Sequence, residues 1–207
     1  MLEAGTALTD YLLTGLCCAC VAAFLHQRQR GTSVGPPLFF AGFALSAAFG
    51  GTWHGFYSLD TGRTQALIWW ASMVFGGLSA AALALTGAEL LGFQRTGLGL
   101  LLAIAFTLAF GAYVAHDDRF LVSIVATTAG MAACITGLAR SLRRDRTGAA
   151  MGIAGLLLAV LAAVGQQAHV ALDPPRIDHN ATYHLLLVPA MLLLFAGLRR
   201  LTPPVTN

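Results

Sequence analysis

The sequence predicts an all-α integral membrane protein, a single bundle of seven transmembrane helices. Three observations support this fold class. Hydrophobic residues make up 57% of the 207 residues and charged residues only 10%, which is outside the usual range of soluble domains. Seven apolar stretches each approach the roughly 20 residues that a helix needs to cross a bilayer. The arginines, finally, gather on one side of a seven-span arrangement.

The seven stretches follow one another with short connections, which leave no room for a second domain. We expect spans near residues 6–25, 37–58, 65–87, 97–115, 120–141, 148–171 and 181–199. The first is followed by the basic segment "QRQR", and the second closes with "GGTWHGFYS". The third opens with "TQALIWW", the fourth ends in "YVAHDDRF", and the sixth ends in "VGQQAHVAL". Pro174 and Pro175 hold the next connection extended, so the seventh begins around Asp178 to Asn180.

The distribution of arginine predicts the orientation in the membrane. Nine arginines fall on one side, namely Arg28, Arg30, Arg95, Arg140, Arg143, Arg144, Arg146, Arg199 and Arg200. Three fall on the other, Arg63, Arg119 and Arg176. Positive residues mark the cytoplasmic side, so the N-terminus is expected outside and the C-terminus inside, in the plasma membrane of a bacterium. The net charge of +3 therefore reflects topology and does not indicate nucleic-acid binding. All twelve basic residues are arginine, which excludes a lysine Schiff base.

Polar residues gather in one layer at the predicted outer ends of the spans. Five of the six histidines lie there, namely His54, His116, His169, His179 and His184. Asp10 lies about one turn inside the first span, and Gln65 opens the third. An acid within a span is costly unless it faces the bundle and finds a partner, so Asp10 is expected to point inward toward a histidine.

The depths of His54 and His184 predict a metal site. Both lie about 6 Å below the outer rim at 1.5 Å per helical residue, and two imidazoles at one level can share a zinc ion. The third ligand stays open between His179, His169 and His116, with Asn180, Thr52 and Gln166 as hydrogen-bonding neighbours. Simpler roles compete with this one. Asp178 or Asn180 is also suited to cap the last helix, and His184 to a hydrogen bond between helices.

The motifs "GGTWHG", "TQALIWW" and "HNATYHLL" resemble those of the seven-helix membrane hydrolases that include alkaline ceramidases and adiponectin receptors. That family carries Ser-x-x-x-His in span two, an aspartate about eleven residues later, and His-x-x-x-His in span seven, with three histidines holding zinc. Here His54 and His184 match, whereas Gly50, Gln65 and Asn180 stand where the family has serine, aspartate and histidine. The last motif is also similar to that of an uncharacterised bacterial group of seven-helix proteins with an H-N/D-x-x-x-H-L pattern.

The resemblance implies a zinc-dependent hydrolase that acts on a lipid-like amide or ester at the outer leaflet. Asp10, Asp117 and Gln65 are then the candidate catalytic residues, because a metal-bound water needs a nearby proton acceptor. The alternative is a non-catalytic seven-helix protein, a sensor or a subunit of a larger complex, whose polar cluster is structural or binds a small ligand. The expected partners are membrane lipids, together with partner membrane subunits or further copies of the chain.

Overall fold

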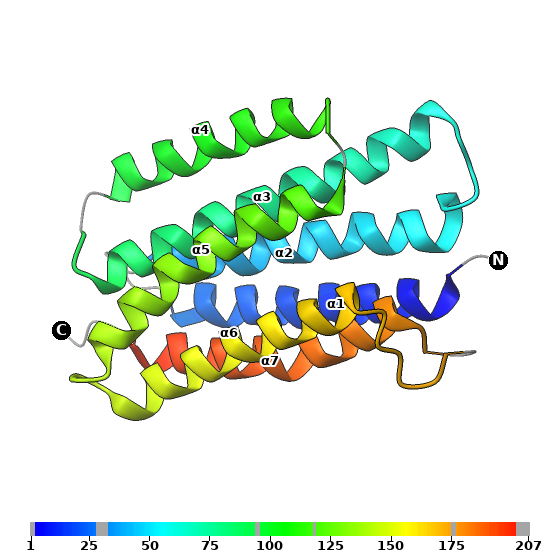
Figure 1. Ribbon diagram of the computed structural model, residues 1–207. Helices are drawn as coiled ribbons and strands as arrows, with labels where there is room; N and C mark the ends of the chain where they lie inside the picture. The colour runs from blue at the N-terminus through cyan, green and yellow to red at the C-terminus, as the bar shows by residue number, and fades with distance from the viewer. Residues whose placement is uncertain (1–2, 28–32, 94–95, 118, 175–176, 202–207) are drawn as a thin grey trace.

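The computed structural model describes residues 3–27, 33–93, 96–117, 119–174 and 177–201, which form seven α-helices, one π-helical turn and no β-strand (Figure 1). The elements are α1 (Ala4–Gln27), α2 (Gly35–Thr52), the π-helical turn η1 (Trp53–Tyr57), α3 (Arg63–Leu90), α4 (Thr96–Val114), α5 (Phe120–Ser141), α6 (Arg146–Gln167) and α7 (His179–Leu201). The predicted all-α fold is confirmed.

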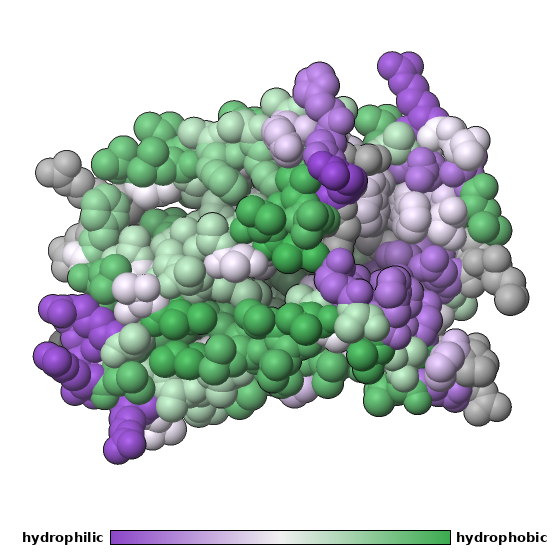
Figure 2. Space-filling model, viewed as in Figure 1, coloured by the Kyte–Doolittle hydropathy of each residue, from purple (hydrophilic) through white to green (hydrophobic). Residues whose placement is uncertain are grey.

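Six of these helices are long and apolar enough to cross a membrane, namely α1 and α3 to α7. The exception is α2, whose 18 residues include two prolines and four glycines. Half of its residues are buried in the protein, so much of the α2 surface is covered by neighbouring helices. Figure 2 shows the corresponding surface, with polar side chains toward the two ends and a broad apolar region between them.

Six helices are arranged as a ring. In chain order α1 packs against α2, α2 against α3, α3 against α5, α5 against α6, and α6 against α7. The contact between α7 and α1 closes the ring, and α4 packs against α3 on the outside (Figure 1). The interior of this ring is therefore shaped by six helices, and α4 takes no part in it.

Glycines bring the helices of the ring close together. A Cβ added at Gly155 of α6 would lie 2.6 Å from the Ala190 carbonyl oxygen of α7, and one at Gly197 would lie 2.5 Å from the Gly148 oxygen. Between helices in a membrane, small residues permit this approach and the van der Waals contact that comes with it. The α6–α7 pair is thus packed backbone against backbone.

Two helix ends differ from the sequence prediction. The second helix was expected to run to residue 58, but its α-helical part ends at Thr52 and His54 lies in the π-helical turn. The sixth was expected to run to residue 171, but α6 ends at Gln167 because His169 adopts a left-handed backbone with φ of 55°. The cap of α7 is Asp178, whose Oδ1 accepts the Ala181 N–H at 2.8 Å.

Candidate functional site

A cavity of about 780 Å³ occupies the centre of the ring. Its polar end is lined by Asp10, His54, Gln166, Asn180 and His184, which come from α1, η1, α6 and α7. The rest of its wall is mainly apolar and includes Phe39, Phe43, Met131, Leu156, Leu187 and Met191. Its volume falls within the range of roughly 300–1,000 Å³ that is usual for small-molecule sites.

Asp10 is held at the cavity by two glycines of α2. A Cβ at Gly51 would lie 2.9 Å from the Asp10 Cβ, so the missing side chain lets α1 approach α2 at this level. A Cβ at Gly50 would lie 3.5 Å from both Asp10 Oδ2 and Ser72 Oγ. Asp10 is only 4% exposed, and its Oδ2 has no hydrogen-bond partner among the residues that the structure describes. A buried polar atom normally has a partner, so this oxygen is the most unusual atom of the cavity.

His184 joins α7 to α1 through both ring nitrogens. Its Nε2 lies 3.4 Å from Asp10 Oδ1, and its Nδ1 lies 3.1 Å from Thr9 Oγ1. The Thr9 hydroxyl donates its one proton to the Thr6 carbonyl oxygen at 2.9 Å, so we assign it as the acceptor of the His184 Nδ1–H. That tautomer leaves one proton to be shared between Nε2 and Asp10. The expectation that Asp10 points inward toward a histidine is confirmed.

His54 has a carboxylate partner of its own. Its Nδ1 lies 2.5 Å from Glu3 Oε2, and the Glu3 N–H donates to the His54 carbonyl oxygen at 3.3 Å. The Trp53 ring stands edge-on against the imidazole with centroids 5.0 Å apart. Because η1 is a π-helical turn, it turns these side chains differently from a continued α-helix, and such turns are frequent at functional sites. His54 and His184 thus line the same cavity, and each imidazole contacts a different acidic residue.

The amides of Gln166 and Asn180 complete the polar end. Gln166 Nε2 donates to Asn180 Oδ1 at 3.0 Å, which joins α6 to α7. This bond fixes the orientation of the glutamine amide, and the buried Gln166 Oε1 has no partner within the described ranges of the chain. Asn180 therefore works as an acceptor between helices, whereas Asp178 caps α7.

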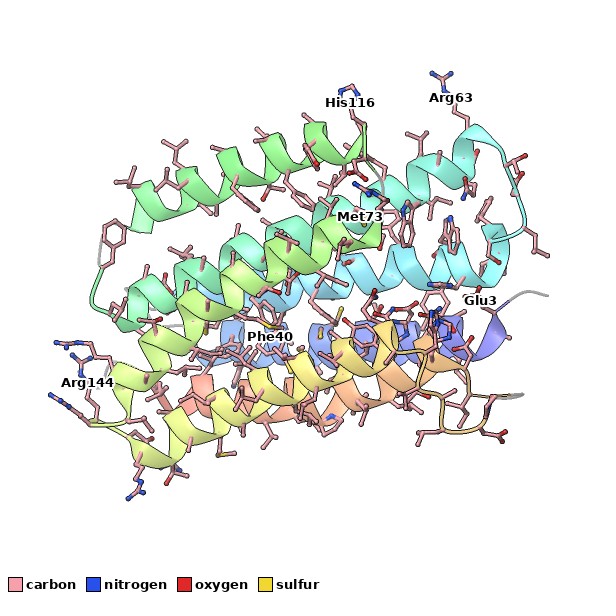
Figure 3. All side chains as sticks on the ribbon, viewed as in Figure 1. Glu3, Phe40, Arg63, Met73, His116 and Arg144 are labelled. Carbon is pink, nitrogen blue, oxygen red and sulfur yellow. The ribbon has the colours of Figure 1, made fainter. Side chains whose placement is uncertain are left out.

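The other predicted histidines lie elsewhere. His169 and His179 contact each other, with ring centroids 4.6 Å apart, and neither lines the cavity. His116 is exposed at the end of α4 and points away from the bundle (Figure 3). Across the residues that the structure describes, no three His, Cys, Asp or Glu side chains are grouped as metal ligands would be. In the described part of the chain, therefore, none of His169, His179 and His116 stands beside His54 and His184 as a third ligand.

The remaining candidate residues also lie outside the cavity. Asp117 is in the α4–α5 connection, where the hydrogen bond from Arg119 lowers the pKa of its carboxyl to about 2. Gln65 lies in the first turn of α3 and does not line the cavity. Thr52 Oγ1 is 2.9 Å from the Tyr11 hydroxyl, in a hydrogen bond between α2 and α1. Asp117 thus belongs to a turn and Thr52 to a contact between helices.

The cavity opens sideways between α5 and α6. These helices meet near their arginine-rich ends, where a Cβ at Gly152 would lie 2.9 Å from Leu138 Cδ2, and they separate toward their other ends (Figure 1). Thr128, Val160 and Val164 line the cavity there and are also exposed at the surface. Two of these three exposed residues, Val160 and Val164, are apolar.

Several polar partners were not among the sequence candidates. Glu3 precedes Asp10 by seven residues, two helical turns, so a search for polar residues on the Asp10 face would have found it. Thr9 is adjacent to Asp10 in sequence and carries no distinguishing signal. Ser46 and Ser72 each donate to the other's carbonyl oxygen at 2.9 Å, which ties α2 to α3 beside the cavity. Such reciprocal bonds depend on which helices are neighbours.

Comparison with curated proteins and with solved structures finds no match to either. A family comparison does find one, which covers residues 5–203 and so takes in all seven helices apart from the first residue of α1. The chain therefore belongs to the Family of unknown function (DUF6962).

Proposed function

We propose that this chain is a seven-span membrane protein that binds an amphiphilic, lipid-like molecule in the central cavity. The observation that carries the proposal is the unpartnered, buried Oδ2 of Asp10 at one end of a cavity whose remaining wall is largely apolar. A carboxyl at this depth costs free energy, and such a residue in a span marks a functional site. A bound head group would supply the missing partner.

The opening between α5 and α6 supports ligand access from the bilayer. A molecule with a polar head and an alkyl chain can move from the lipid past Val160 and Val164 without crossing water. Its chain would then lie among Phe43, Leu156 and Leu187, while its head reaches Asp10. No catalytic step is needed for this role, which corresponds to a sensor or a lipid-binding subunit.

Photo-crosslinking tests this function directly. The purified protein in lipid nanodiscs is treated with a single-chain alkyl diazirine amphiphile, and the labelled peptides are identified by mass spectrometry. We expect labels on the cavity-lining segments of α5, α6 and α7, and a several-fold loss of these labels in Ala163→Trp, which narrows the opening. Ala112→Trp, on the exposed face of α4, is the matched control. Labels confined to lipid-facing residues outside the cavity would contradict the proposal.

The proposed orientation has the N-terminus outside and the C-terminus in the cytoplasm of a bacterium, with α2 as the seventh span. It is supported by the nine-to-three distribution of arginine and by the short, glycine-rich α2 lying between α1 and α3. In this orientation the polar end of the cavity lies toward the outer leaflet. The α6–α7 connection and η1 then lie on the outer side.

A zinc-dependent hydrolase of lipid amides or esters is the second candidate, favoured by one observation. His54, His184 and Asp10 line the same cavity, so two histidines and a carboxyl face one space. Among the described residues, no three His, Cys, Asp or Glu side chains are grouped as ligands of one metal ion. Elemental analysis separates the two candidates. Near-stoichiometric zinc in the wild type that is lost in both His54→Ala and His184→Ala would favour the hydrolase, whereas our first proposal expects metal-free protein.

A further inference from the structure

The two unpartnered side-chain atoms that line the cavity are both hydrogen-bond acceptors. One is Asp10 Oδ2 and the other is Gln166 Oε1. The third buried side-chain atom without a partner in the described part of the chain, Trp53 Nε1, belongs to a residue that does not line the cavity. A head group that satisfies both oxygens has to present several donors.

The two acceptors are brought to the same end of the cavity by α7. His184 lies beside Asp10, and Asn180 lies beside Gln166. Asn180 and His184 are four residues apart, about 6 Å along the helix axis, and so share a face. The side chains that hold the two acceptors therefore contact α7 within about one helical turn of each other.

The charged side chains in and around the cavity are mainly acidic. Asp10 is the acid that lines it, and no arginine is among its lining residues. The chain contains no lysine. Glu3 contacts the lining residue His54, and Asp178 accepts from Thr6 at 3.1 Å on the neighbouring face of α1. An anionic head such as a phosphate or carboxylate would meet Asp10, and the lining residues that can carry a positive charge, His54 and His184, are each already beside an acid.

We propose that the ligand is an amphiphilic primary amine, whose ammonium group binds between Asp10 and Gln166 while its alkyl chain lies along the apolar wall. The inference rests on the proposed function. An ammonium has three donors and no acceptor, which suits a site with two unpaired acceptors. Its positive charge also favours the carboxylate form of Asp10, in which the proton shared with His184 is no longer on the acid. An alcohol offers one donor and no charge, so it satisfies the site only in part.

Competition between amphiphiles of equal chain length tests the inference. Dodecylamine, dodecanol and dodecyl phosphate are each titrated against labelling by the alkyl diazirine probe in nanodiscs. We expect dodecylamine to compete best and dodecyl phosphate least. In Asp10→Asn, half-inhibition by the amine should require roughly 10- to 100-fold more ligand, the size of one charged hydrogen bond, with dodecanol unchanged. Gln166→Leu should weaken the amine by a smaller factor.

Asp60→Asn is the matched control, because Asp60 is exposed in the α2–α3 connection and accepts from the Thr61 and Gly62 N–H groups of its own turn. It removes the same charge outside the cavity and should leave the ranking unchanged. If none of the three amphiphiles displaces the probe, the proposed function itself is wrong. If dodecanol or dodecyl phosphate competes as well as the amine, cavity binding stands and the ammonium assignment is overturned.

Discussion

Replacing Gly155 by alanine tests how closely α6 and α7 pack. The added Cβ would lie 2.6 Å from the Ala190 carbonyl oxygen and 2.7 Å from the Leu194 nitrogen, both backbone atoms that no rotamer change can move. Ordinary contact begins near 3.4 Å, so the two helices would have to separate locally by about 0.8 Å (3.4 minus 2.6). The strain therefore falls on the backbones of both helices.

The magnitude follows from two opposing effects. Overpacking a tight interface costs about 1–3 kcal/mol, and rigid backbone neighbours favour the upper half of that range. Alanine is a better helix former than glycine by up to about 1 kcal/mol, which offsets part of the cost. We expect Gly155→Ala to lower the free energy of unfolding by roughly 1–2 kcal/mol.

The assay is reversible unfolding of the purified protein in detergent, with SDS as denaturant and helical circular dichroism as the signal. Gly15→Ala is the matched control, since Gly15 is exposed on α1 and a Cβ there would meet nothing within 4 Å. It should be as stable as the wild type or slightly more so. Equal stability of the Gly155 and Gly15 variants would refute the close approach of α6 and α7.

Three further predictions concern the helix ends and the topology. Glu89 accepts backbone N–H groups from the start of α2, so Glu89→Ala should lower the free energy of unfolding by about 1–3 kcal/mol in the same assay. The exposed control Asp60→Ala should lower it far less. In Arg119→Ala the Asp117 pKa should rise from about 2 toward its ordinary value of 3.8, as followed by carboxyl NMR titration. The stabilisation from this lowered pKa is present above pH 4 and is lost as the pH falls toward 2. An Asp117 titration that is unchanged in Arg119→Ala would show that Arg119 does not cause the lowered pKa. Reporter fusions in the α3–α4 and α5–α6 connections should read cytoplasmic, and a periplasmic signal from either would reverse the proposed orientation.

The helices could be predicted from sequence because each apolar stretch has the length that a helix needs to cross a bilayer. The errors lie where backbone geometry departs from the α-helix, at the π-helical turn after Thr52 and at the left-handed His169. Hydropathy does not register either departure, because it depends on residue composition and carries no information on backbone dihedral angles. The presence of α2 was predicted correctly even though its prolines and glycines make it the least clear of the seven as a span.

The site was predictable in part, and for a definable reason. An acid inside a span must face the bundle, which was sufficient to expect Asp10 beside a histidine. Which histidine it meets depends on the contact of α1 with α7, between residues that are 174 positions apart in sequence. The pairing of His54 with Glu3 and of His169 with His179 depends in the same way on helix order and rotation. A single sequence carries no direct record of either.

The contact that closes the ring joins α1 to α7, the first of the seven helices to the last, and this sets the order of events during synthesis. A ribosome adding roughly 5–20 residues per second needs about 10–35 s to travel from Asp10 to His184. Throughout that interval α1 has been synthesised, whereas His184, whose imidazole contacts the Asp10 carboxyl, has not. The polar end of the cavity is therefore assembled last, and a nascent chain interrupted before α7 would present Asp10 to the insertion machinery or to lipid as an uncompensated acid.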